Sequence, residues 1–533
     1  MSKYSQKLIL FAVFSVFFYK NVTAREIHVS PSNLKVTWSS INPGDKVIFS
    51  DGEYRDEMLL LANKAWSTNQ PTIFIAESAG KAIIKGSDIV KGWHKIDSKR
   101  YAKDWSIEPA QVFINGVGLT QLGGTIFGGF PNDPTSSYNK LHQENNGGGI
   151  WPGRFSFSKD SEMPINSFYY DKDSYKLILN VTVNPNQSKV EVSVRRRPFY
   201  AEGVSGIVLD GLVFEHANTS IAGRGAALTI IGNNNIIRNV VVRNVDLAGI
   251  QTVGDGNQLL NSIAEYNGQM GVTMRGAKNR VVGVNASFNN TRGFNKWWEA
   301  GGFKLVGERG FNEAEFLHNI AVGNNGDGIW FDWKNKHNLI KGNVAAYNTG
   351  FGIHYELSQH AIIQDNKVYG NGQRGVFLRD SANCEVSNNL VIGNGLEGIV
   401  AVYTGQKDAK GTEFGAENAK VNANIVGWNN GALIMPKGAS TIGMADNNVY
   451  LGDQKSNRFS LGYPSTFSRA VNTLKDWQTI SSFDKKSVEG NFLMPKEIAE
   501  SLSKRELIKD WSDVIKLVEQ VKKNQGSVDF KSF

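Results

Sequence analysis

Two acidic residues occupy the same position of an internal repeat and are suited to act together on one bond. Asp332 ends residues 328–332 (GIWFD), and Glu356 ends the matching residues 352–356 (GIHYE), one repeat of about 23 to 26 residues further on. If both segments are strands of neighbouring coils, their carboxyl groups lie roughly 5 Å apart and face an open groove. Two carboxyl groups this close rarely ionise together, so one can act as an acid and the other as a nucleophile. Enzymes that cleave glycosidic bonds with retention hold their two catalytic carboxyl groups about 5 to 5.5 Å apart.

The same two acids also fit a purely structural ladder of ion pairs. Arg379, one repeat beyond Glu356, would pair with Glu356, and Lys304 or Lys334 would pair with Asp332. Directly opposed like charges destabilise a sheet, so a structural ladder would more often alternate in sign. The pattern therefore favours a functional pair and leaves the ladder as the alternative.

Residues suited to bind a sugar gather in the same columns of the repeat. The second and fourth positions after each repeat glycine point outward, because side chains alternate between the faces of a strand. Between Gly271 and Gly302 the spacing rises to 31 residues, and the extra residues include two tryptophans. Aromatic faces stack on sugar rings, although the same tryptophans would also serve to pack a loop onto the core. The residues predicted to bind substrate are Lys304, Trp330, His354, Arg379, Trp333, Arg275, Trp297 and Trp298.

The repeat itself predicts a stack of β-strand coils. Five segments that open with glycine align without a gap, and apolar residues alternate with variable ones in each of them: residues 302–306, 328–332, 352–356, 375–379 and 398–402. Between the strands there is no helical periodicity and no leucine-rich consensus. We therefore predict an all-β fold, a right-handed parallel β-helix, whose hand follows the usual chirality of parallel crossovers.

Asparagines recur in two series at the predicted corners of the coils. Asparagine tolerates left-handed turns, and stacked asparagines can bond the equivalent residues above and below them. We expect two ladders, one of Asn239, Asn261, Asn285, Asn319, Asn343, Asn366, Asn389 and Asn424, and one of Asn244, Asn267, Asn289, Asn324, Asn348, Asn371, Asn394 and Asn429.

The chain divides into five parts. Residues 1–24 indicate a secretory signal peptide, so we expect export to a periplasm or to the outside of the cell. Residues 25–100 are predicted to form the first coils, and residues 101–200, where the repeat lapses, an inserted β-rich subdomain. Residues 201–455 form the main coils with the active site, and residues 456–533 a C-terminal cap with an amphipathic helix over 495–520. A coil stack grows along one axis, so a chain of 533 residues needs no second large core.

Composition and motifs exclude several other classes of partner. Cys384 is the only cysteine, so no disulfide can form within the chain. The formal net charge of +8 comes without an aromatic nucleic-acid motif, so we expect no nucleic acid partner, and the leader is too short for stable membrane insertion. The histidines lack metal-ligand spacing, and no phosphate-binding glycine loop occurs, so no metal or cofactor is predicted. The expected partner is an oligo- or polysaccharide, and the sequence predicts no particular oligomeric state.

Around the two acids the chain resembles the parallel β-helix glycoside hydrolases, most nearly the β-xylosidases of glycoside hydrolase family 120. The resemblance rests on residues 330–333 (WFDW), 355–357 (YEL) and 300–304 (AGGFK). It implies Asp332 as the nucleophile and Glu356 as the acid/base. Weaker similarity over the rest of the chain is shared with many secreted β-helix proteins that act on carbohydrates.

Two other functions stay open beside hydrolysis. A polysaccharide lyase or uronate epimerase would use basic residues or Tyr403 to remove the proton α to a uronate carboxylate, with Asp332 and Glu356 as calcium ligands. A non-catalytic glycan-binding solenoid would use the tryptophan loop for binding, and its acids would only accept hydrogen bonds from the sugar.

Overall fold

The structure is a computed structural model that describes most of the chain. It covers residues 24–32, 38–60, 64, 66–123, 163–219, 225–297, 299–306, 310–408, 410–436, 443–452, 456, 458–462 and 469–525. The predicted signal peptide lies outside these residues except for Ala24.

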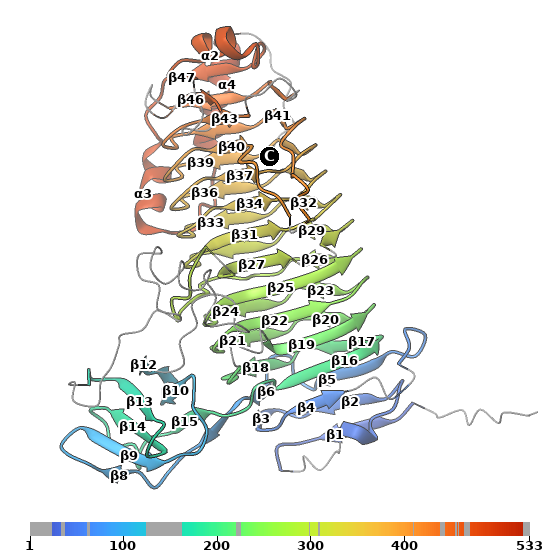
Figure 1. The fold of residues 1–533 in the computed structure, drawn as a ribbon, viewed down its shortest axis with the longest axis vertical. Helices are drawn as coiled ribbons and strands as arrows, with labels where there is room; N and C mark the ends of the chain where they lie inside the picture. The colour runs from blue at the N-terminus through green and yellow to red at the C-terminus, as the bar shows by residue number, and fades with distance from the viewer. Residues whose placement is uncertain are drawn as a thin grey trace, which may run out of the picture.

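Parallel sheets form the three faces of a tall column (Figure 1). Within the described residues, one face is a thirteen-stranded sheet and another a fourteen-stranded sheet. The third face is a five-stranded sheet followed by a seven-stranded one, and isolated bridges through Asn285 connect the two. Each full coil adds one strand to each face, which is the predicted parallel β-helix.

The fourteen-stranded sheet carries the predicted site. Its strands run in the order β4 (Met58–Leu60), β16 (Phe199–Ser205), β19 (Ala226–Asn233), β22 (Ala248–Val253), β25 (Met270–Ala277), β27 (Gly301–Val306), β31 (Asp327–Asp332), β34 (Ile353–Glu356), β37 (Val376–Arg379), β40 (Ile399–Val402), β43 (Leu433–Met435), β46 (Phe459–Leu461) and β47 (Arg469–Val471), with β28 (Phe311–Asn312) beside β25. The predicted alternation is confirmed, because Phe331 and Tyr355 are fully buried in the core with their ring centroids 5.6 Å apart.

The other two faces complete the coils. The thirteen-stranded sheet contains β1 (Glu26–Val29), β2 (Lys46–Phe49), β5 (Thr72–Ala76), β17 (Ile207–Asp210), β20 (Ile236–Arg238), β23 (Gln258–Leu260), β26 (Arg280–Val282), β29 (Glu315–Leu317), β32 (Leu339–Lys341), β35 (Ile362–Gln364), β38 (Glu385–Ser387), β41 (Lys420–Asn422) and β44 (Met444–Asp446). The third face contains β3 (Gly52–Tyr54), β6 (Ala82–Lys85), β18 (Val213–Glu215), β21 (Val241–Arg243) and β24 (Ile263–Glu265), then β30 (Ile320–Val322), β33 (Val344–Ala346), β36 (Lys367–Tyr369), β39 (Leu390–Ile392), β42 (Ile425–Gly427), β45 (Val449–Leu451) and β48 (Val488–Gly490).

Asparagine ladders hold the corners of the coils, as predicted for most of their members. The amide of Asn348 donates to Asn371 at 2.9 Å, and Asn371 donates to Asn394 at 2.9 Å. The prediction is wrong for Asn239, whose side chain donates to Asp210, for Asn261, which is exposed, and for Asn244 and Asn285. Asn239, Asn244 and Asn261 adopt positive φ, so they are turn residues beside the ladder position. Asn285 also lies beside it, because the backbone N–H of Val284 donates to the ladder residue Asn319.

An inserted β subdomain lies beside the foot of the column (Figure 1). One sheet contains β11 (Val117–Gly118), β10 (Val112–Ile114), β15 (Val190–Ser193) and β7 (Ser87–Ile89). The other contains β12 (Thr120–Leu122), β13 (Ser167–Asp171), β14 (Lys176–Asn180), β9 (Arg100–Asp104) and β8 (His94–Lys95). A separate apolar core that includes Trp93, Phe168 and Leu179 fills this subdomain. In sheet order it begins at Ser87, ahead of the predicted boundary at residue 101.

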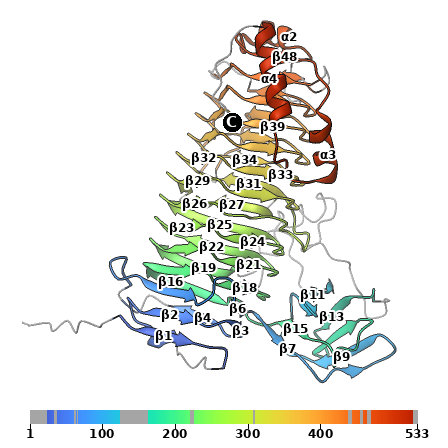
Figure 2. The ribbon, with the colours of Figure 1, turned by 180° about the vertical axis from the view of Figure 1, so that it is seen from behind.

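Helices cover the C-terminal end and one side of the column. Helix α2 (Leu474–Ser481) places Trp477, fully buried, in the main core. Helices α3 (Lys496–Lys504) and α4 (Ser512–Gln525) lie along the seven-stranded sheet (Figure 2). The prediction of one helix over 495–520 is wrong, because Arg505 ends α3 in a left-handed conformation. The apolar spacing continues across the break because Trp511 also packs on the sheet.

Candidate active site

Consecutive strands of the fourteen-stranded sheet bring the two predicted acids together. Strands β31 and β34 pair in parallel, so that Asp332 is the register partner of Glu356 and Trp330 is the partner of His354. Strand β37 follows on the other side and places Arg379 beside Glu356. The two acids are therefore neighbours in one outward column, as the repeat predicts.

Each acid has a cationic partner of its own. Lys304 Nζ lies 2.8 Å from Asp332 Oδ2, and the ammonium group also lies over the ring of Trp330. Arg379 Nη1 donates to Glu356 Oε1 at 2.7 Å, and Trp330 Nε1 donates to Glu356 Oε2 at 3.1 Å. Both ion pairs of the structural alternative are thus present. The two negative charges are balanced separately, and each carboxyl group is held in a fixed orientation.

The site is more enclosed than the open groove that the sequence suggests. Lys304, His354 and Glu356 are each at most 5% exposed, although all three point away from the core of the coils. Asp332 and Arg379 keep more contact with solvent, with side chains 19% and 32% exposed. Trp297, from the insertion between Gly271 and Gly302, and Tyr403, from the loop after β40, lie near these side chains.

His354 occupies the centre of the site. Its imidazole stacks between Trp330 and Phe377, with ring centroids at 5.1 and 5.0 Å. Nδ1 lies 2.9 Å from Asp327 Oδ2, and Asp327 Oδ1 accepts the backbone N–H of Phe351. Nε2 is buried without a hydrogen-bond partner. Nε2 lies 3.6 Å from Oε2 of Glu356, so two aromatic rings and two carboxylates surround this imidazole.

A cavity of about 840 Å³ opens onto this centre. Its volume lies in the range of small-molecule sites, and it combines aromatic, cationic and acidic groups. Five of the predicted site residues line it: Glu356, His354, Trp330, Arg379 and Trp297. The remaining lining residues are Asp327, Phe351, Gln373, Arg374, Phe377, Leu396, Tyr403 and Thr404.

Other predicted residues lie elsewhere. Asp332 and Lys304 are beside the cavity and are not part of its lining. Trp333 packs against Phe414, with ring centroids at 5.5 Å, because its positive φ turns the chain as β31 ends. Arg275 lies on β25, which precedes β27 in the sheet. Trp298 lies outside the described residues.

The site contains one further column of residues that was not among the predicted ones. The residues directly before three consecutive repeat glycines are Asp327, Phe351 and Arg374, and all three line the cavity. The repeat spacing contains this signal, but each predicted strand begins at glycine, one residue too late to include it. Tyr403 and Thr404 follow β40 in a loop without repeat character, so no periodicity marks them as cavity residues.

Comparisons with known proteins bear on the fold. Residues 294–414 match the family model described as the right-handed β-helix region. No curated protein sequence matches this chain. The solved complex of XylC with xylose has a TM-score of 0.61 at 15% identity, covering 88% of this chain and 87% of that one. The protein is a right-handed parallel β-helix.

Two further solved β-helix structures are more distant. A glycoside hydrolase has a TM-score of 0.48 at 11% identity, covering 82% of this chain and 94% of that one. The A-module of the Azotobacter vinelandii mannuronan C-5 epimerase AlgE6 has a TM-score of 0.45 at 12% identity, with 87% and 94% covered.

Tyr403 is tied to an acidic residue at the edge of the cavity of this β-helix. Its hydroxyl group donates to Glu413 Oε2 at 2.8 Å. This hydrogen bond raises the pKa of Tyr403, since loss of the proton would place two negative charges together. The residue is therefore poorly suited to act as a base.

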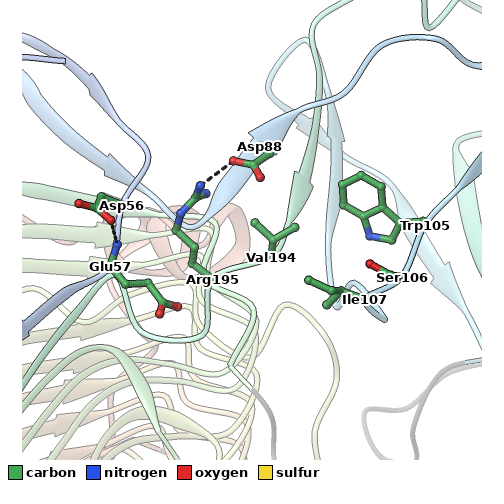
Figure 3. A pocket seen from close by; sticks show the side chains of 8 residues that line it. All are labelled: Asp56, Glu57, Asp88, Trp105, Ser106, Ile107, Val194 and Arg195. Carbon is green, nitrogen blue, oxygen red and sulfur yellow. Dashed lines mark hydrogen bonds and ion pairs between the residues drawn. The ribbon is translucent and has the colours of Figure 1, made fainter. Parts of the chain in front are cut away.

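A second cavity, of about 500 Å³, lies between the coils and the inserted subdomain (Figure 3). Its lining includes Trp105 and three acidic residues, Asp56, Glu57 and Asp88. Asp88 pairs with Arg195 at 2.8 Å, and the other two acids accept backbone or indole N–H groups. All three acids thus have partners within the protein.

No group of three or more His, Cys, Asp or Glu side chains suited to a metal ion occurs among the residues described. In the same part of the chain, no helix is both long and apolar enough to cross a membrane.

Proposed function

We propose that this protein is an exported glycoside hydrolase that cleaves glycosidic bonds with retention. The observation that carries the proposal is the register of Asp332 with Glu356 on adjacent strands of one outward face. Neighbouring strands are about 4.8 Å apart, which is compatible with the carboxyl separation of about 5 to 5.5 Å used by retaining enzymes. The resemblance of these residues to family 120 supports the same assignment.

The proposed reaction has two half-reactions. Asp332 attacks the anomeric carbon while Glu356 gives a proton to the leaving oxygen, and a glycosyl ester forms on Asp332. Water then attacks the same carbon and gives a proton to Glu356, which releases the sugar. The ion pair with Lys304 keeps Asp332 oriented for attack, and Arg379 and Trp330 orient Glu356.

The substrate is a saccharide in this proposal. The cavity offers Trp297, 47% exposed, as a surface on which a sugar ring can stack. The structurally similar XylC was solved with xylose, and its 15% identity supports the fold without fixing the sugar bound here.

A polysaccharide lyase or uronate epimerase is the second candidate. It is favoured by a cavity that contains Arg374, Arg379 and His354 but not Asp332. The arginines would neutralise a uronate carboxylate, and His354 would remove the α proton. Calcium fits this site poorly, because Asp332 and Glu356 already pair with cationic side chains.

Replacement of Asp332 tests the proposal. We expect Asp332→Asn to lower kcat by roughly 10⁴-fold or more on whichever glycoside the wild type cleaves, with circular dichroism unchanged. Glu315→Gln, an exposed carboxylate on another sheet, is the control and should keep full activity. Mass analysis of products from a panel of oligosaccharides separates the candidates. Gain of water indicates hydrolysis, an unsaturated end indicates a lyase, and binding without product indicates the non-catalytic alternative.

A further inference from the structure

The hydrogen bonds of Asp327 fix the orientation of His354. A carboxylate only accepts hydrogen bonds, and Asp327 accepts one from Phe351 N and one from His354 Nδ1. His354 Nδ1 therefore carries a proton. With one proton on Nδ1, the neutral ring presents the lone pair of Nε2 on its opposite side.

That lone pair faces a carboxylate oxygen. His354 Nε2 lies 3.6 Å from Glu356 Oε2, both residues are at most 5% exposed, and Nε2 has no other partner. Two acceptors facing each other in a buried site repel, and an unsatisfied buried acceptor is costly. A single proton between the two atoms removes both penalties.

The surroundings suit a positive charge on the ring. Trp330 and Phe377 stack on its two faces within 5.1 Å and nearly parallel, and aromatic faces attract cations. Asp327 and Glu356 lie at its two nitrogens. Three cations lie nearby: Arg379 on Glu356, Arg374 over Phe377 and Lys304 over Trp330. Arg374 also pairs with Glu397, and Lys304 with Asp332.

We propose that His354 and Glu356 share one proton, and that His354, held by Asp327, is the positioning residue that keeps Glu356 supplied with the proton used in acid catalysis. This inference rests on the proposed hydrolase function. Arg379 and Trp330 contact Glu356 as hydrogen-bond donors that keep their own protons, so neither can supply the proton that acid catalysis uses.

The proton balance follows the two half-reactions. The pair holds one proton in the free enzyme. That proton passes through Glu356 to the leaving oxygen as the glycosidic bond breaks. Glu356 is then a carboxylate, and His354 is neutral with its one proton on Nδ1. The attacking water returns one proton to Glu356 when it hydrolyses the ester on Asp332, which restores the starting state.

Dependence on the leaving group tests the role of His354. A nitrophenyl glycoside needs little protonation of its leaving oxygen, whereas an alkyl glycoside or oligosaccharide needs it fully. We expect His354→Asn, which removes Nε2, to lower kcat/KM about 10²-fold or more for the poor leaving group and less than about 10-fold for nitrophenol. His360→Asn alters a histidine stacked on His337 outside the site and should change neither rate.

A second variant tests the same proton by changing the hydrogen-bond partner of His354 Nδ1. In Asp327→Asn the side-chain amide can still accept from Phe351 N but donates to His354 Nδ1, which forces the ring proton onto Nε2. We expect the same selective loss on poor leaving groups. An equal fall on both substrates in both variants would mean that His354 is only structural, and would overturn the proposal.

Nuclear magnetic resonance of protein labelled with ¹⁵N-histidine tests whether His354 and Glu356 share a proton, and it does not depend on an activity assay. We expect the Nε2 resonance of His354, assigned by its loss in His354→Asn, to be displaced toward a protonated nitrogen and to return to the neutral value in Glu356→Ala. A wild-type resonance equal to that of a free, unprotonated nitrogen would overturn the inference. Absence of any glycoside hydrolysis by the wild type would instead reject the proposed function.

Discussion

The two acids have identical chemistry and different neighbours. Asp332 pairs with Lys304, and its side chain is 19% exposed beside the cavity. Glu356 accepts from Arg379 and Trp330 and lies 5% exposed in the cavity wall. A nucleophile benefits from a single orienting cation and an accessible oxygen, whereas an acid/base must exchange protons with a defined partner. The residue environments therefore support the assignment that the resemblance implies.

A buried carboxyl group far from the site gives a prediction that depends on pH. Asp246 is fully buried, and its Oδ1 accepts the backbone N–H of Thr219. Burial raises the pKa of Asp246 to about 7, although Arg292 at 3.9 Å acts in the opposite direction. In the unfolded chain the group titrates near its ordinary value of about 3.9. The folded state therefore binds more protons than the unfolded state between these two values.

It follows that this group destabilises the fold progressively as the pH rises from about 4 to about 7. We expect Asp246→Asn, which has no charge to bury, to lose less stability than the wild type over this range. The measurement is the free energy of unfolding in urea at several pH values, with Glu315→Gln as an exposed control. Curves for Asp246→Asn and wild type that stay parallel across the range would contradict the assigned cause.

At the scale of strands and coils, the fold and part of the site follow from the periodicity of the sequence. The alternation after each glycine identifies the inward residues, and stacking at a fixed period brings Asp332 beside Glu356 without any structural information. The repeat does not predict which loop residues lie over the outward face of the fourteen-stranded sheet. Tyr403 comes from a loop with no repeat, and its contact with the cavity depends on how that loop folds back. Sequence spacing therefore does not predict this contact.

The asparagine ladder supplies a test of how neighbouring coils are joined. Asn371 donates to Asn394 and to the carbonyl of Ala345, and it accepts from the backbone and side chain of Asn348. Removal of the side chain leaves these buried groups unpaired, at about 1 to 3 kcal/mol for each unsatisfied group. We expect Asn371→Ala to lower Tm by several degrees in thermal denaturation.

Asn430→Ala is the matched control for this ladder, because Asn430 is exposed and adjacent to the ladder residue Asn429. A Tm for Asn371→Ala equal to that of Asn430→Ala would show that the ladder contributes little to stability. In a solenoid each coil contacts only its neighbours, so we expect the loss to be local and cooperativity to decrease.

At the scale of the whole molecule, two faces of the column have separate roles. The fourteen-stranded face holds the candidate site, and the seven-stranded face is covered by the C-terminal helices. Without these helices, outward apolar residues on that second face, such as Tyr369 and Leu390, would lose the side chains that pack against them. The sequence predicts helical cover for the solenoid from apolar spacing, while the break at Arg505 reflects a contact with the sheet that spacing does not encode.

Trp511 packs the C-terminal helices onto the sheet. Its replacement tests whether the helix-covered face and the face with the candidate site are independent. It is 7% exposed, its ring centroid lies 5.2 Å from that of Tyr369, and Val514 and Val518 of α4 belong to the same cluster. Truncation of a buried tryptophan costs about 3 to 5 kcal/mol. We therefore expect Trp511→Ala to release α4 at a lower temperature than in the wild type, measured as an early transition in calorimetry. Leu493→Ala, in the same segment but with Leu493 92% exposed, should have no such transition.

Because the site lies on another face, kcat/KM of Trp511→Ala well below the transition temperature should equal that of the wild type. A loss of activity in a folded Trp511→Ala protein would show that the two faces are coupled.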